Sequence, residues 1–184
     1  MQANWRQPLK NISHALALIL LLSLTGAGLA SARRNDDLIL KLPPGWIKGH
    51  MAENRREQSE ILELIRPGDD IDNWKELLTE LSYPKPRGIR KPEEMLDRIK
   101  ALREKECPGS TVWTVIGEDE ESITYEWHFQ SCLGQPEQLQ IAKILVGKRT
   151  VYFLQYAKKV KELPAHERDT WLKWLAEAKL GDSH

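Results

Sequence analysis

The 184-residue chain carries 27 Lys and Arg against 27 Asp and Glu, which gives a formal net charge of zero at pH 7. Binding to nucleic acid depends on clustered Lys and Arg that displace counterions, so this balance argues against a nucleic-acid partner. The length suits a single domain with a sizeable apolar core.

Residues 1–32 have the composition of a signal peptide. Arg6 and Lys10 precede an apolar run from Ala15 to Leu24, and the small residues Ala30-Ser31-Ala32 form a cleavage pattern. Cleavage after Ala32 predicts a periplasmic or secreted protein without a membrane span. The alternative is an uncleaved signal-anchor of the inner membrane that faces the periplasm, because the segment is near the lower length limit for a span.

After the leader, residues 33–37 are charged and predict a flexible lead-in, and residues 38–184 predict one domain. Residues 38–42 are apolar and run into a Pro-Pro-Gly-Trp turn, which is typical of an edge strand or a strand entry. A strand is expected over 59–65, and the polar residues 50–58 predict an exposed hairpin connection before it.

Two helices are expected next. Asp69 and Asp70 are candidate N-caps for a helix with apolar residues at helical spacing, namely Ile71, Trp74, Leu77, Leu78 and Leu81. A second helix opens at Pro92, carries Met95, Ile99 and Leu102 on one face, and stops at Cys107-Pro108-Gly109.

Four strands follow, over residues 111–116, 122–130, 138–146 and 149–157. Tyr125, Trp127 and Phe129 alternate with polar residues, which indicates an antiparallel sheet with one buried face. A last helix begins near Pro164 and has an apolar stripe of Trp171, Trp174, Leu175 and Ala178. The chain is thus expected to be an α+β domain whose helices cover an antiparallel sheet.

Cys107 and Cys132 are the only cysteines. In an oxidising compartment, an even pair in a small domain predicts one disulfide. The alternative is a redox-active pair, which usually has the closer Cys-x-x-Cys spacing.

Several short motifs together resemble small secreted proteobacterial proteins of the PsbP-like α/β/α sandwich type. They are Leu42-Pro43-Pro44-Gly45-Trp46, Arg66-Pro67-Gly68 followed by Asp72-Asn73-Trp74, the cysteine pair with Trp127, the turn Gly134-Gln135-Pro136-Glu137, and Lys143. The resemblance implies an α/β/α fold and a location in the cell envelope. It implies no activity, because the fold serves as a binding or assembly module.

Two features are candidates for partner binding. The proline-punctuated segment 83–92 carries four cations, Lys85, Arg87, Arg90 and Lys91, and predicts either a basic docking loop or a rigid linker between helices. Trp46 and Trp113 lie outside the predicted apolar stripes, so either is a candidate for lining a groove.

The sequence predicts no cofactor and no metal site. His128 and Cys132 lie about 13 Å apart on a strand, too far to share a zinc ion. His166 has acidic neighbours but no recognisable nucleophile. The acidic clusters at residues 69–72 and 118–121 lack the ligand spacing of an EF-hand loop.

These observations predict a non-catalytic envelope protein that binds a protein or another cell-envelope component. One alternative is a small envelope hydrolase that uses paired carboxylates, whose separation only a structure reveals. Another is an inhibitor or immunity protein, which is a special case of the binding module.

Overall fold

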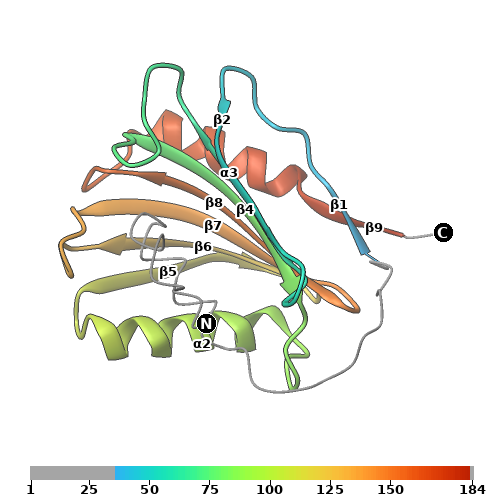
Figure 1. Ribbon diagram of the computed structural model, residues 1–184. Helices are drawn as coiled ribbons and strands as arrows, with labels where there is room; N and C mark the ends of the chain where they lie inside the picture. Colours follow the sequence, from blue (N-terminus) through green and yellow to red (C-terminus); the bar gives the residue numbers. More distant parts are fainter. Residues whose placement is uncertain (1–35, 183–184) are drawn as a thin grey trace, which may run out of the picture.

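The computed structural model describes residues 36–182, so the predicted signal peptide lies outside the described residues. Seven antiparallel strands form the central sheet in the order β2-β3-β4-β8-β7-β6-β5, and β1 and β9 form a separate antiparallel pair. Helices α2 and α3 pack on opposite faces of the large sheet (Figure 1). The predicted α+β class, with helices covering an antiparallel sheet, is confirmed.

The elements are β1 (Asp36–Ile39), β2 (Ile47–Asn54), β3 (Ser59–Ile65), β4 (Glu76–Pro84), α2 (Pro92–Glu106), β5 (Thr111–Glu118), β6 (Ser122–Phe129), β7 (Gln138–Val146), β8 (Thr150–Lys158), α3 (Ala165–Glu177) and β9 (Lys179–Asp182). Among these described elements, no helix has both the length and the apolar character that crossing a membrane requires.

The strands predicted over 59–65, 111–116, 122–130, 138–146 and 149–157 are confirmed as β3, β5, β6, β7 and β8, with ends that shift by at most two residues. On β6, Tyr125, Trp127 and Phe129 are buried and the residues between them are partly exposed, as the alternation predicted. Strands β7 and β8 are buried on both faces because each lies between the two helices.

The helix predicted after Asp69 and Asp70 is wrong, because the chain there forms a turn and then β4. Leu81 packs on the α2 side of the sheet and Leu78 on the α3 side. In a strand that is buried on both faces, apolar residues occupy odd-numbered and even-numbered positions alike. Over a short stretch of sequence this pattern resembles the apolar spacing of a helix. Asp69 and Asp70 accept backbone N–H bonds within the turn instead.

The exposed connection predicted over residues 50–58 is wrong in its first half. Residues 50–54 belong to β2, and the turn occupies only residues 55–58. The polar composition of this stretch reflects the place of β2 at one edge of the sheet, where side chains meet solvent. Asp36 and Asp37, expected in the lead-in, pair with β9 as part of β1.

The second predicted helix is confirmed as α2, which begins at Pro92 and ends just before Cys107. The Glu94 carboxylate accepts hydrogen bonds from the backbone N–H groups of Arg90 and Lys91 at 2.6 and 3.3 Å, just before the first turn. Met95 and Leu96 are buried against the sheet.

Helix α3 begins after Pro164 and buries the predicted stripe of Trp171, Trp174 and Leu175. Lys143 of β7 donates from Nζ to the carbonyl oxygen of Ala178 at 2.9 Å. This bond places a cation at the negative end of the helix and fixes the exit of α3 toward β9.

Candidate binding surface

The basic segment 83–92 joins β4 to α2 and is tied down at several points. Ile89 is buried, the Lys85 N–H donates to the carbonyl oxygen of Arg149, and Arg98 Nη2 donates to the carbonyl oxygen of Arg87. Arg90 forms an ion pair with Glu94 at 3.6 Å. These contacts favour the linker interpretation, while docking through the exposed cations of this segment stays a prediction.

Trp46 and Trp113 are both half-buried and pack on other aromatic rings. Trp46 meets Trp171 edge-on at 5.7 Å between ring centroids, and the Arg66 guanidinium lies 4.0 Å from its ring. Trp113 stacks on Trp127 at 4.7 Å. A pocket of about 10 Å³ is lined by other side chains, including Leu40, Leu64 and Trp174, and by neither of these two tryptophans.

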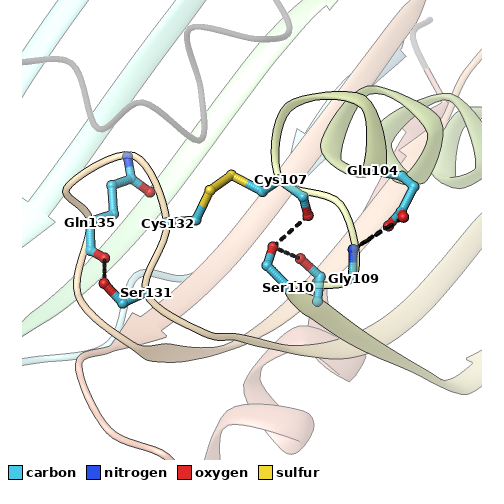
Figure 2. Close-up of a disulfide and its surroundings, with 8 residues drawn as sticks. Glu104, Cys107, Gly109, Ser110, Ser131, Cys132 and Gln135 are labelled. Atoms are coloured by element: carbon cyan, nitrogen blue, oxygen red, sulfur yellow. Dashed lines mark hydrogen bonds between the residues drawn. A yellow bond between two sulfur atoms is a disulfide. The ribbon is translucent and has the colours of Figure 1, made fainter.

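Cys107 and Cys132 form the predicted disulfide, with 6.2 Å between their Cα atoms. Figure 2 shows that the bridge joins the C-terminal end of α2 to the loop between β6 and β7. The start of β5 is tied to the same place, because the Gln130 N–H donates to the carbonyl oxygen of Ser110 at 2.8 Å. We call residues 107–111 and 130–137 the disulfide corner.

Further hydrogen bonds make the disulfide corner rigid (Figure 2). The Gly109 N–H donates to the Glu104 carboxylate at 3.1 Å, and Ser110 Oγ donates to the Cys107 carbonyl oxygen at 2.7 Å. Across the loop, Ser131 Oγ donates to the Gln135 carbonyl oxygen at 2.9 Å. The bridge and the Ser131–Gln135 bond therefore constrain the backbone of the loop between β6 and β7.

This rigid loop presents a leucine to solvent. Leu133 is 63% exposed and has a φ of 52°, in the left-handed region that a leucine rarely adopts. Such a conformation persists only where the surroundings enforce it, and strained positions cluster at functional sites. We therefore regard Leu133 as a candidate contact residue.

Strand β5 adds a second apolar region that begins at the disulfide corner. It is an edge strand, and among the described strands its one neighbour in the sheet is β6. Val112, Val115 and Ile116 are 62%, 45% and 38% exposed. Proteins usually protect an edge strand with charges, prolines, β-bulges or a covering segment. The register of β5 shifts between Val115 and Gly117, but its three apolar side chains lie open to solvent. We call Leu133 and these three residues the candidate binding surface, which runs from the disulfide corner along the edge of the sheet and includes side chains from both of its faces.

The sequence did not reveal this surface. The run from Thr111 to Ile116 is as apolar as a buried central strand, so its place at the edge follows only from the strand order. For Leu133, the following Gly134 indicates a turn but gives no sign that the leucine would be exposed.

The residues weighed as metal or catalytic candidates have structural contacts. His128 Nε2 lies 2.8 Å from Glu137 Oε1. Asp119 accepts the backbone N–H groups of Glu121 and Ser122 and thereby closes the β5–β6 hairpin. Among residues 36–182, no group of three His, Cys, Asp or Glu side chains is arranged to hold a metal ion.

Two carboxylates do converge beside α3, with a lysine between them. Lys158 Nζ lies 3.2 Å from Glu76 Oε1 and 2.8 Å from Glu167 Oε1, and Tyr156 donates to the latter oxygen at 2.6 Å. Burial opposes ionisation of Glu167, but the bonds from Lys158 and Tyr156 prevail and lower its pKa. This network anchors the start of α3 to β4 and β8.

Comparison of the sequence with known protein families found no matching family model, and the search of curated proteins also gave no match.

Proposed function

We propose that this chain is an exported, non-catalytic binding module that docks another envelope protein through the candidate binding surface. The observation that carries the proposal is the exposure of Leu133, Val112, Val115 and Ile116 on a rigid part of the fold. Apolar side chains along an exposed sheet edge release water when a partner covers them, and such an edge favours pairing with another chain.

Export is supported by the composition of residues 1–32 and by the Cys107–Cys132 bridge, since disulfides persist outside the cytoplasm. The layering of α2, sheet and α3 is compatible with the PsbP-like α/β/α resemblance. The intact mass of the protein recovered from its host tests export. A chain that begins at Arg33 and gains two alkyl groups only after reduction is expected, whereas a full-length chain with two free thiols would contradict it.

A photo-crosslinking amino acid placed at Leu133 or at Val112 in the native host tests docking. Met51 is the matched control, because it is equally apolar and 60% exposed but lies on β2 at the opposite edge of the sheet. We expect one adduct of defined mass from Leu133 and Val112 and none from Met51. The substitution Leu133→Asp should remove the adduct formed at Val112.

The basic segment provides the competing surface for the same experiment. An adduct formed at Arg87 and absent at Leu133 would place the partner on that segment and contradict our proposal. Equal labelling at Leu133, Val112 and Met51 would also contradict it, because it would show collision with many proteins and no fixed interface.

A further inference from the structure

We propose that strand β5 receives an extended segment of the partner as an eighth, antiparallel strand of the sheet, and that this segment carries basic residues at its amino end. The inference rests on the proposed function and names the chemistry of the partner. It draws on three features of β5, namely its free backbone groups, its exposed valines and the acidic hairpin at its end.

Before the register shift between Val115 and Gly117, the free edge of β5 offers a regular set of backbone groups. The Ser110 carbonyl oxygen accepts from Gln130, and bonded residues alternate along an antiparallel ladder. Val112 and Thr114 therefore bond toward β6, which leaves the N–H and C=O groups of Thr111, Trp113 and Val115 directed away from the sheet. An added strand would pair with these groups, which is the usual mode of recognition at a sheet edge.

The exposed side chains set which residues such a strand would carry. Val112 lies opposite His128 and Val115 opposite Tyr125, so the two valines project from opposite faces of the sheet. The residues that would lie across from them in the added strand are three positions apart. Apolar residues at both positions would cover Val112 and Val115, because directly opposed side chains on neighbouring strands are in contact.

The direction of the added strand determines which of its ends lies beside a charged part of β5. β5 ends in a hairpin where Glu118, Glu120 and Glu121 are exposed, and among the described residues the carboxylate of none of them has a hydrogen-bonding or ionic partner. Every strand pair in the seven-stranded sheet is antiparallel. An antiparallel eighth strand would begin beside the hairpin, so its amino end would meet the three carboxylates and would favour Lys or Arg there.

The predicted preference for basic residues at the amino end is tested with synthetic peptides. Each peptide consists of Val, Ile and Thr, has two Lys at its amino end and is amidated at its carboxyl end. The control peptide has the same composition with both Lys at the carboxyl end. Fluorescence anisotropy with the oxidised protein should show about tenfold tighter binding of the first peptide at low salt. Glu120→Lys combined with Glu121→Lys should reverse this preference. Equal affinities of the two peptides would overturn the assignment of direction and charge.

A second pair of variants tests the backbone pairing. Val115→Pro removes an N–H that points away from β6, whereas Val115→Thr keeps both this donor and the β-branched shape. We expect the proline variant to lose peptide binding and the threonine variant to retain it. If circular dichroism shows that Val115→Pro does not fold, the peptide preference of the Glu120→Lys and Glu121→Lys double variant still tests whether the peptide binds along β5.

The outcomes separate this inference from the proposed function. A crosslink at Leu133 with no peptide binding to β5 would overturn strand addition and leave the docking module intact. Dimerisation of the protein alone that Val115→Pro abolishes would show that a second copy occupies the edge, and would also overturn the inference. Loss of both the crosslink and peptide binding would overturn the proposed function and the inference together.

Discussion

Both faces of the central sheet pack apolar side chains against a helix, but their buried polar groups differ in whether they have hydrogen-bonding partners. On the α3 face the polar atoms have partners: Tyr156 donates to Glu167, Trp174 Nε1 donates to the Lys41 carbonyl oxygen, and Lys143 donates to Ala178. Arg168 of α3 also forms an ion pair with Glu126 of β6 at 2.6 Å. Helix α3 is thus held by apolar contacts and by fixed polar bonds.

The α2 face buries polar atoms without partners among the described residues. They are Glu63 Oε1, Thr79 Oγ1, Tyr83 Oη, Arg103 Nε and Nη2, Tyr125 Oη, Trp127 Nε1 and Gln140 Oε1. The Arg103 guanidinium is covered by the Phe129 ring at 3.8 Å but donates from neither of these nitrogens. Each unpaired buried group opposes folding.

The two helices are therefore attached to the sheet by different means. Helix α3 adheres through its own side chains, whereas α2 packs over a partly polar face and is bound covalently at its C-terminal end by Cys107. The α2 face should therefore open at a lower free energy than the α3 face, as local stability varies within a domain. Three changes test this ranking.

The largest effect is expected from Trp171→Ala, which removes the central side chain of the α3 face. Trp171 stacks on Tyr156 at 4.1 Å and meets Trp46 and Trp174 edge-on. We expect a loss of about 4 kcal/mol in the free energy of unfolding, measured by urea denaturation. Trp113→Ala is the control on the α2 face, and its half-buried ring should cost about 2 kcal/mol. An equal loss in the two variants would contradict the ranking.

The α3 face was also the easier one to predict from the sequence. The stripe of Trp171, Trp174 and Leu175 identifies α3 because a helix with one apolar side shows its period plainly. The alternation on β6 was equally clear. Strand β4 was misread as a helix because both of its faces are buried, and one sequence window cannot separate that pattern from an irregular helix.

The candidate binding surface could be predicted only in part. The Cys107–Cys132 pairing followed from the count of two cysteines and the predicted compartment. The exposure of Val112 and Leu133 depends on strand order and on a backbone angle, both of which are set by contacts between distant residues. β9 was missed for the same reason, since it pairs with β1 at the other end of the domain.

Removal of the disulfide is expected to have the second largest effect. The bridge spans 25 residues of sequence, and Cys107→Ala with Cys132→Ala should cost about 3 kcal/mol in the free energy of unfolding. Hydrogen exchange should then accelerate in α2 more than in α3. Ser131→Ala removes one bond of the same loop and should cost about 1 kcal/mol without this difference between the helices. Equal acceleration in α2 and α3 would show that the bridge stabilises the whole domain and does not hold α2 in particular.

The smallest effect concerns Glu63, a buried carboxyl group on the α2 face. Burial raises its pKa from 4.5 to about 7. Between these pH values the folded protein keeps a proton that the unfolded chain releases, so the free energy of unfolding falls as the pH rises, and the penalty is complete above pH 7. From about pH 5 to about pH 8 we expect a decline of about 2 kcal/mol that Glu63→Gln lacks, measured by urea denaturation.

His50 is the control for this pH dependence, because it lies opposite Glu63 on β2. A His50→Gln variant should keep the decline if Glu63 causes it. A decline that persists in Glu63→Gln and disappears in His50→Gln would assign the pH dependence to the histidine. The α2 face would then bury its carboxyl group at no cost in stability, and the contrast between the two faces would rest on the uncharged polar atoms and Arg103 alone.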